Sequence, residues 1–195
     1  MSEPAQADGP PRLDRERSVL LIVDAQARLA PHIADHEAVL ARLEALAAAA
    51  RGFGIPLLAT EHCPDQLGPT VAALREPLTR QAVIAKQHFG AADEPALRAR
   101  LQSLARRQVV IAGMEAHVCV MQTALGLRAL GYAVWIAADA MGSRPGRQAD
   151  RVWALDRLAR AGCMLAGTET VLFEWLADAA DPQRPALIQT IKRLP

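Results

Sequence analysis

Six short, almost uninterrupted apolar runs alternate with longer amphipathic segments along this 195-residue chain. Strands that are apolar at nearly every position are typical of a parallel sheet that is covered on both faces. Repeated β-helix-β units require right-handed crossovers, which place the sheet between two layers of helices. We therefore predict an α/β fold: a three-layer α/β/α single domain with a parallel, six-stranded, Rossmann-like sheet. The predicted strands are residues 18–24, 55–60, 82–86, 108–113, 132–139 and 162–167.

Helical spacing and recognisable helix ends mark the segments between these runs. Three of the segments finish at Gly54, Gly131 and Gly162, each just before a strand, and glycine adopts the left-handed conformation that ends a helix. Asp93 is expected to cap a further helix with Pro95 in its first turn. The residues expected to face the core are Val39, Leu43, Leu46, Ala50, Phe53, Leu97, Leu101, Leu104, Val152, Leu155 and Leu158, with Leu187, Ile191 and Leu194 in a last helix.

Composition narrows the classes of function. The formal net charge is +1 and aromatic residues make up 4% of the chain, so no basic surface attracts nucleic acid or an anionic membrane. The first residues lack the apolar core of a signal peptide, and no apolar run is long enough to span a bilayer. Three widely spaced cysteines favour a reducing cytoplasm over a disulfide framework. We predict a flexible N-terminal tail over residues 1–16, one domain over residues 17–195, and no nucleic-acid or membrane partner.

Residues 109–120, VVIAGMEAHVCV, predict a reactive thiol. A β-branched run stops at Gly113, a short polar turn follows, and Cys119 opens a helix-favouring segment. A thiol at a helix N-terminus, past the carboxyl end of a strand, lies in a field that favours the thiolate and lowers its pKa. Reacting groups of open α/β sheets also gather at that edge. Cys119 is therefore the first candidate nucleophile.

Two other strands deliver reactive side chains to the same edge. The first strand ends in Asp24 and the third in Lys86, and the carboxyl ends of parallel strands share one edge of a sheet. Asp24 is placed to accept the thiol proton and return it to a leaving amine, while Lys86 stabilises the thiolate. Lys86 and Lys192 are the only lysines of the chain, which indicates that a compact ammonium is required at the strand end.

Each of these residues taken alone has a structural interpretation. A lone cysteine is most often a small buried hydrophobe, which is our interpretation of Cys163. Asp24 alone would cap a turn, and Lys86 alone would be a solvated strand end. Asp139, at the end of the fifth strand, is interpreted as a loop-capping or salt-bridging residue. Only the joint placement of acid, lysine and cysteine at one sheet edge favours catalysis.

Spacing disfavours histidine, metal and dinucleotide sites. His117 lies two residues before Cys119 and points in a different direction, so we interpret it as a turn or pocket-wall residue. Residues 61–63, Glu-His-Cys, are adjacent, which is the wrong spacing for convergent metal ligands. The turn after the first strand has no glycine and presents Asp24 where a pyrophosphate would lie. We therefore expect no metal and no cofactor.

Several segments resemble the isochorismatase-like cysteine hydrolase superfamily. They occur in the expected order and span most of the chain: LLIVDAQARL, AKQHF with Lys86 at the strand end, GMEAHVCV and ADAMGSR. The segments TEHCPDQLGPTV and GMEAHVCVMQTALGLRALGY are most similar to the branch of isochorismatase domain-containing proteins. The resemblance implies a three-layer α/β/α domain that is usually assembled as a dimer or a larger oligomer, so we expect a homo-oligomer.

The resemblance also implies the roles of the site residues. The Asp-Lys-Cys triad of the family falls on Asp24, Lys86 and Cys119. A cis peptide bond is implied between Met114 and Glu115. The oxyanion hole implied by the resemblance consists of the backbone N–H groups of Glu115 and Cys119.

Two departures from the family pattern restrict the activity. Nicotinamidase-type members bind a metal through an Asp-x-His pair after the second strand, where this chain has Glu61 and His62, so nicotinamidase is disfavoured. Isochorismatases proper generally lack the cysteine, so Cys119 argues against vinyl-ether hydrolysis.

We therefore predict a cytoplasmic hydrolase that cleaves a small-molecule amide or a related C–N bond through a Cys119 thioester. One alternative is a catalytically silent interaction or thiol-sensing protein on the same fold. The other is an isochorismatase-type vinyl-ether hydrolase. The candidate pocket walls are Gln26, Leu29, His62, Leu67, Phe89 and His117.

Overall fold

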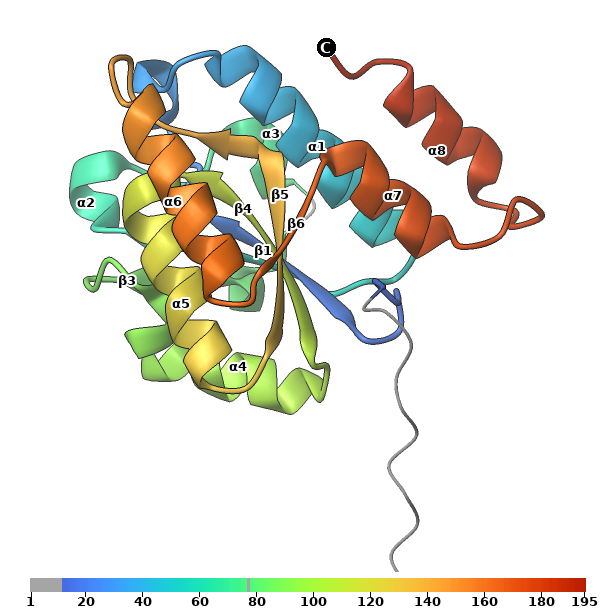
Figure 1. Ribbon diagram of the computed structural model, residues 1–195, viewed down its shortest axis with the longest axis horizontal. Helices are drawn as coiled ribbons and strands as arrows, with labels where there is room; N and C mark the ends of the chain where they lie inside the picture. The colour runs from blue at the N-terminus through green and yellow to red at the C-terminus, as the bar shows by residue number, and fades with distance from the viewer. Residues whose placement is uncertain (1–11, 77) are drawn as a thin grey trace, which may run out of the picture.

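The apolar runs assemble into one sheet. The computed structural model describes residues 12–76 and 78–195. All six strands are parallel, in the order β3-β2-β1-β4-β5-β6, which confirms the predicted α/β/α fold (Figure 1). The strand order reverses between β1 and β4, and doubly wound sheets bind ligands at the carboxyl side of such a switch point. The strands are β1 (Ser18–Val23), β2 (Leu57–His62), β3 (Val83–Lys86), β4 (Gln108–Met114), β5 (Ala133–Gly142) and β6 (Met164–Ala166).

Helices cover both faces of the sheet. Helices α1, α7 and α8 cover one face, and α4, α5 and α6 cover the other (Figure 1). The long helices are α1 (His36–Gly52), α4 (Pro95–Leu104), α5 (Met121–Ala129), α6 (Gln148–Arg160), α7 (Thr168–Leu176) and α8 (Arg184–Ile191). Shorter turns are η1 (Ala30–His32), α2 (Pro64–Leu67), α3 (Ala72–Arg75), η2 (Arg80–Ala82), η3 (Ala91–Asp93) and η4 (Ala116–Val120).

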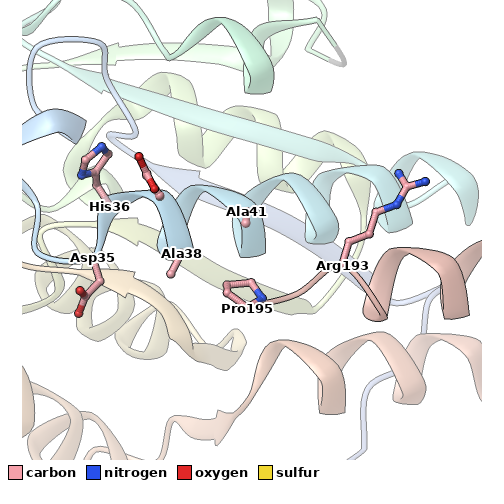
Figure 2. A pocket seen from close by; sticks show the side chains of 7 residues that line it. Asp35, His36, Ala38, Ala41, Arg193 and Pro195 are labelled. Atoms are coloured by element: carbon pink, nitrogen blue, oxygen red, sulfur yellow. The ribbon is translucent and has the colours of Figure 1, made fainter.

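The last residues of the chain lie along α1. Nη2 of Arg42 donates a hydrogen bond of 2.9 Å to the Pro195 carbonyl. Asp35 and Ala38, at the start of α1, and Arg193 and Pro195 border a cavity of about 500 Å³ (Figure 2). None of the predicted catalytic residues borders this cavity.

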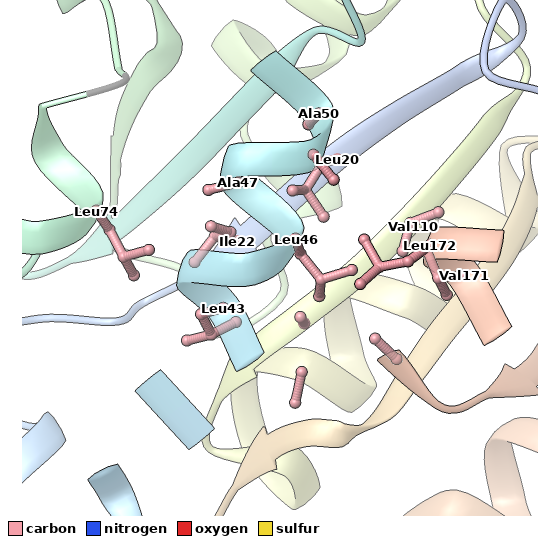
Figure 3. Close-up of a cluster of buried hydrophobic side chains, with 14 of the residues drawn as sticks. Leu20, Ile22, Leu43, Leu46, Ala47, Ala50, Leu74, Val110, Val171 and Leu172 are labelled. Atoms are coloured by element: carbon pink, nitrogen blue, oxygen red, sulfur yellow. The ribbon is translucent and has the colours of Figure 1, made fainter. Parts of the chain in front are cut away.

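Alternation along the strands divides the core into two layers. On β1, Leu20 and Ile22 belong to the cluster under α1, whereas Leu21 and Val23 belong to the cluster under α4, α5 and α6. Figure 3 shows the first cluster, in which Leu43 of α1 packs over the side chains of β1. Because each strand position is buried on one face or the other, the strand sequences are almost continuously apolar.

The three predicted helix-ending glycines are confirmed, whereas two predicted helix details are wrong. Gly54, Gly131 and Gly162 have φ angles of +67°, +85° and +80°. Helix α4 has Glu94, not Asp93, at its N-cap position, and no side chain caps it. Val152, predicted to face the core, is 59% exposed, because other side chains of α6 form its buried face.

The predicted flexible tail, residues 1–16, falls mostly on residues 1–11, which lie outside the described residues. Its last part is packed: Leu13 is buried, and its N–H donates a 2.8 Å hydrogen bond to Oε2 of Glu174. The packed chain therefore begins before residue 17. Among the described residues, no helix is long and apolar enough to cross a membrane.

Candidate functional site

Two of the three candidate catalytic residues form an ion pair at the carboxyl edge of the sheet. Nζ of Lys86, the last residue of β3, lies 2.8 Å from Oδ2 of Asp24, the residue after β1, and both side chains are completely buried. Oδ1 of Asp24 accepts a 2.6 Å hydrogen bond from the hydroxyl of Thr60 on β2. Oδ2 accepts no hydrogen bond from a described residue besides this ion pair. One carboxylate oxygen is therefore held by β2, and the other faces the ammonium of β3.

Close approach of β1 and β4 brings Cys119 to the same place. Gly113, near the end of β4, has a φ angle of +128°, and a Cβ atom there would lie 2.0 Å from the Val23 carbonyl oxygen. Cys119 follows in η4, and its thiol is close enough to Asp24 and Lys86 for both to shift its pKa. Asp24 itself has a φ angle of +51°, in the left-handed region that aspartate tolerates better than most residues.

The Lys86 ammonium makes three polar contacts within the described residues: one ion pair and two hydrogen bonds. Besides the Asp24 carboxylate, Nζ donates to the backbone carbonyls of His88 and Phe89, each at 3.1 Å. Two of the three N–H groups of the ammonium therefore bond to backbone carbonyls, and the cation is also paired with the Asp24 carboxylate. The segment that follows β3 therefore forms a cradle for the cation.

The pKa of Cys119 differs in direction from the sequence prediction. Burial raises the pKa of the Cys119 thiol to about 12, and the negative charge of Asp24 adds to the effect, which the ammonium of Lys86 only partly opposes. The sequence prediction of a lowered pKa is therefore wrong. It considered the helix field and a cation but neither the desolvation of the thiol nor the adjacent carboxylate. At neutral pH the resting site holds a thiol next to a carboxylate.

The turn between β4 and Cys119 has a fixed side chain and a free backbone donor. The peptide bond between Met114 and Glu115 is cis. Oε2 of Glu115 accepts hydrogen bonds from the backbone N–H of Arg144 at 3.0 Å and from its Nε at 2.9 Å. The backbone N–H of Glu115 donates no hydrogen bond to any residue that the structure describes. The carboxylate is thus turned toward Arg144, while the amide remains available.

Gln26, a candidate pocket wall, holds the loop after β2 in place. Its side chain is completely buried. Nε2 donates to the carbonyls of His62 and Gly68 at 3.1 and 2.7 Å, and Oε1 accepts from the His62 N–H at 2.8 Å. Because its amide group bonds to the backbone of both His62 and Gly68, Gln26 connects the end of β2 to the loop that follows it.

His62, the last residue of β2, and Phe89, in the segment after β3, form an aromatic pair. Their ring centroids are 5.0 Å apart, and Phe89 is 52% exposed. Burial and the nearby Lys86 ammonium lower the pKa of His62, with the Asp24 carboxylate opposing them. Nδ1 of His62 is buried and has no hydrogen-bond partner among the described residues. His62 is therefore a neutral, partly buried ring in electrostatic range of the ion pair.

The remaining candidate wall residues, Leu29, Leu67 and His117, are all partly buried. Leu29 packs on the core cluster under α1. Nδ1 of His117 lies 3.0 Å from the hydroxyl oxygen of Ser143, after β5. No group of three or more potential metal-binding side chains gathers within residues 12–76 and 78–195.

Two structural interpretations are confirmed, and a side-chain partner of Asp24 was not predicted. Cys163 is buried, and Asp139 accepts hydrogen bonds from the backbone N–H and hydroxyl of Thr168 at 2.7 and 2.8 Å. Asp139 also pairs with Arg42 at 3.2 Å. Thr60, the hydroxyl donor to Asp24, was not predicted; its only signal is its position at the end of the predicted second strand, IPLLAT.

Comparison with known proteins identifies the family. The sequence model of the isochorismatase domain matches residues 18–170. The chain is 37% identical over 172 residues to isochorismatase domain-containing protein 2 of Danio rerio, covering 88% of this chain and 85% of that protein. It is 36% identical over 176 residues to isochorismatase domain-containing protein 1 of Danio rerio, covering 90% of this chain but only 61% of that longer protein.

Solved structures agree with this assignment. The fold is similar to a protein of Caenorhabditis elegans described as MAR1 ribonuclease, with 29% identity, a TM-score of 0.87 and 95% of each chain covered. It is also similar to the YcaC gene product of Escherichia coli, an octameric hydrolase of unknown specificity, with 26% identity, a TM-score of 0.85 and 96% and 91% of the two chains covered. The sequence match over most of the chain and the shared fold lead to one conclusion: this chain belongs to the isochorismatase family, whose members have an isochorismatase-like hydrolase fold.

Proposed function

We propose that this chain is a cysteine hydrolase that cleaves a small-molecule amide or a related C–N bond through a thioester on Cys119. The observation that carries the proposal is the buried Asp24–Lys86 ion pair, 2.8 Å long, next to a buried thiol that it influences. Burying two charges is unfavourable unless they are paired, and such groups cluster at functional sites. Asp24, Lys86 and Cys119 are proposed as the catalytic residues.

The first half of the reaction requires proton transfer together with attack. Because the pKa of the Cys119 thiol is about 12, the thiol is protonated at rest, and its proton moves to Asp24 as sulfur attacks the carbonyl carbon. Lys86 keeps the carboxylate oriented and stabilises the negative charge that develops on sulfur. The backbone N–H groups of Glu115 and Cys119 are proposed to hold the carbonyl oxygen as it becomes an oxyanion.

The second half returns the site to its resting state. Asp24 gives its proton to the nitrogen of the leaving amine, the C–N bond breaks, and an acyl thioester remains on Cys119. A water molecule then loses a proton to Asp24 and attacks the thioester carbonyl. The C–S bond breaks, the carboxylic acid leaves, and the proton returns to the thiol sulfur. One amide bond and one water are consumed in each cycle, and no other reactant is required.

Intact-mass measurement with a panel of small primary and secondary amides tests this proposal. We expect an acyl adduct on Cys119 and release of the amine, and both should disappear in Cys119→Ala. Cys163→Ala is the matched control, because Cys163 is also a buried thiol with a pKa raised by burial, but Arg128 rather than an acid-lysine pair is its charged neighbour. Asp24→Asn should abolish the adduct without removing the thiol. Amide hydrolysis that survives in Cys119→Ala would refute the mechanism.

The alternative functions are separate outcomes of the same experiment. A thiol-sensing protein would oxidise at Cys119 and yield no acyl adduct with any amide. A vinyl-ether hydrolase would release pyruvate from isochorismate. The C. elegans protein of similar fold is described as a ribonuclease, so RNA cleavage is assayed beside the amides. Any of these results without amide cleavage would contradict the proposed reaction.

We also propose a homo-oligomer located in the cytoplasm. The proposal is supported by the octameric E. coli neighbour and by Val152 and Trp153 of α6, which are 59% and 67% exposed. Large apolar side chains on the surface are removed from water when copies of a chain associate through them. All three cysteines are free, as in reducing compartments. Light scattering should show an oligomer that Trp153→Glu weakens, whereas a monomer would contradict the proposal.

A further inference from the structure

A single carboxylate oxygen organises the segment that cradles Lys86. Oε1 of Glu94 accepts hydrogen bonds from the backbone N–H of Gln87 at 3.0 Å and from that of His88 at 3.2 Å. It also lies 2.8 Å from Nδ1 of the His88 ring. Three donors from two adjacent residues therefore meet on one oxygen.

The same segment supplies both backbone carbonyls that accept hydrogen bonds from the Lys86 ammonium. The peptide units fixed by Glu94 lead directly to the carbonyls of His88 and Phe89, both 3.1 Å from Nζ of Lys86. On its other side, the Phe89 ring stacks against His62 with a centroid distance of 5.0 Å. The cradle is thus anchored by a carboxylate at one end and by an aromatic contact at the other.

Glu94 does not perform the role that its place in the chain would suggest. It occupies the N-cap position of α4, where a side-chain oxygen usually accepts hydrogen bonds from the helix amides. No such bond forms here, and the carboxylate is turned back toward Gln87 and His88. Burial alone would raise the pKa of Glu94, but the hydrogen bonds from His88 and the Gln87 amide outweigh it and lower the pKa below its ordinary value. The ionised carboxylate is therefore favoured in this position.

We propose that Glu94 is a positioning residue for the reaction: it acts through the cradle at His88 and Phe89 to hold the Lys86 ammonium against Asp24 and Cys119. The proposal rests on the proposed function in that Lys86 is taken to assist the thiol. Glu94 does not contact the reacting atoms. Its effect on Cys119 must pass through Lys86, and this dependence makes the proposal testable.

The charged groups around the cradle are accounted for. His88 and Glu94 form the outer pair, with His88 60% and Glu94 15% exposed. Lys86 and Asp24 form the inner pair, and His62 is influenced by Lys86, Asp24 and Glu94. Asp93, next to Glu94, is exposed. Its backbone N–H donates a hydrogen bond to the Gly90 carbonyl, but its carboxylate accepts no hydrogen bond from a described residue. Asp93 therefore provides a carboxylate of similar location that is not connected to Lys86.

The test measures the rate at which iodoacetamide alkylates Cys119, followed by peptide mass spectrometry at pH 8. In Glu94→Ala, Lys86 loses its alignment and stabilises the Cys119 thiolate less, so we expect alkylation about tenfold slower. Glu94→Gln keeps a carbonyl oxygen that accepts the two backbone N–H groups, so we expect it to remain within about threefold of wild type. Asp93→Ala, the matched control, should change the rate by less than about twofold.

A double-mutant cycle separates action through Lys86 from altered access to the thiol. In a Lys86→Met background, Glu94→Ala should change the alkylation rate by less than about twofold, because the residue through which it acts is gone. An equal effect of Glu94→Ala in both backgrounds would overturn the proposal, as would a faster rate or a rate equal to that of Asp93→Ala. If Lys86→Met does not fold, the comparison of Glu94→Ala, Glu94→Gln and Asp93→Ala decides the matter by the same criteria.

The result is independent of whether the chain cleaves amides. Alkylation requires only the thiolate of Cys119, so it reports on Lys86 even in a protein without amide turnover. Absence of an acyl adduct in wild-type protein would refute the proposed function alone. An alkylation rate of Cys119 that Glu94→Ala leaves unchanged would refute the positioning role alone.

Discussion

The two edges of the sheet both bury polar side chains, but in different electrostatic states. At the carboxyl edge, Asp24 and Lys86 are charged and completely buried. At the amino edge, the buried polar residues Ser18, Gln108 and Trp175 carry no charge. The Ser18 hydroxyl lies 2.7 Å from the Asp14 carbonyl and 3.2 Å from Oε1 of Gln108, and it accepts the indole N–H of Trp175 at 3.1 Å.

The difference supports the proposal that the carboxyl edge of the sheet carries the chemistry. The neutral cluster around Ser18 is closed, with none of its side-chain atoms left without a partner among the described residues. At the other edge, Oδ2 of Asp24, apart from its ion pair with Lys86, and Nδ1 of His62 are buried and have no hydrogen-bond partner among the described residues. A satisfied neutral network stabilises a fold, whereas a buried ion pair contributes little net stability and is sensitive to the loss of either partner. We therefore expect changes at the amino edge to alter stability alone, and changes at the carboxyl edge to alter the chemistry of Cys119 as well.

The substitution with the largest expected effect is Gly113→Ala, which disrupts the close approach of β1 and β4. In Gly113→Ala, the new methyl carbon would lie 2.0 Å from the Val23 carbonyl oxygen, and alanine would have to adopt a φ angle of +128°. Neither β1 nor β4 can move without disturbing the core, so we expect a loss of more than about 4 kcal/mol in the free energy of unfolding. Urea denaturation measures it. Gly131→Ala is the control, because nothing lies within 4 Å of a Cβ there. A Gly113→Ala protein as stable as Gly131→Ala would contradict the described strand contact.

Loss of the cation at the carboxyl edge ranks next. Lys86→Met leaves the Asp24 carboxylate buried without its ion-pair partner, and breaking a buried pair in this way destabilises proteins by about 3–5 kcal/mol. Replacing both charges, in Asp24→Asn with Lys86→Met, should recover most of that loss but none of the activity. Chemical denaturation at pH 7 provides the comparison. If the double variant were no more stable than the single one, the ion pair would not be the source of the effect.

The sequence predicts the elements of this comparison unequally. The strands, the sheet and the helix-ending glycines could be predicted, because an apolar run or a glycine indicates the structure at its own position in the chain. Asp24, Lys86 and Cys119 could be named because parallel strands end at one edge. Thr60 and Glu94 could not, since their partners lie far along the chain or depend on how a loop turns back.

The pKa of Cys119 shows a further limit of sequence reasoning. A helix start and a lysine are visible in the sequence, and both lower a thiol pKa. Burial and the distance to Asp24 depend on packing in three dimensions, and here they dominate. Helix α6 gives the same lesson: the apolar spacing correctly placed Leu155 and Leu158 against the core, but it also included Val152, which is 59% exposed.

Removing one hydroxyl from each edge sharpens the comparison. Ser18→Ala leaves the Trp175 indole N–H without its acceptor, so we expect a loss of about 1–3 kcal/mol in stability and no change in Cys119 alkylation. Thr60→Val removes the hydroxyl donor to Asp24 and should change the alkylation rate by about tenfold, because a carboxylate that loses a hydrogen bond changes its effect on the thiol. Thr60→Ser should restore the wild-type rate. A change of the alkylation rate in Ser18→Ala equal to that in Thr60→Val would remove the distinction between the edges.

The smallest expected effect is the contribution of the buried thiol to alkaline stability. The ordinary pKa of the thiol is 9.0 and its folded pKa is about 12, so both states are protonated below pH 9 and stability is unaffected there. Above pH 9 the unfolded thiol loses its proton while the folded thiol keeps it, so stability falls by up to about 1.4 kcal/mol per pH unit until about pH 12. Cys119→Ala has no thiol to lose a proton at this position, so it should lose less stability than wild type between pH 9 and pH 10. Urea denaturation of both proteins at pH 9 and pH 10 measures the difference. Between pH 7 and pH 8, the free energies of unfolding of the two proteins should change in parallel. If the free energies of unfolding of the two proteins changed in parallel up to pH 10, the folded thiol would titrate at its ordinary pKa. Cys119 would then be no more desolvated in the folded protein than in the unfolded chain.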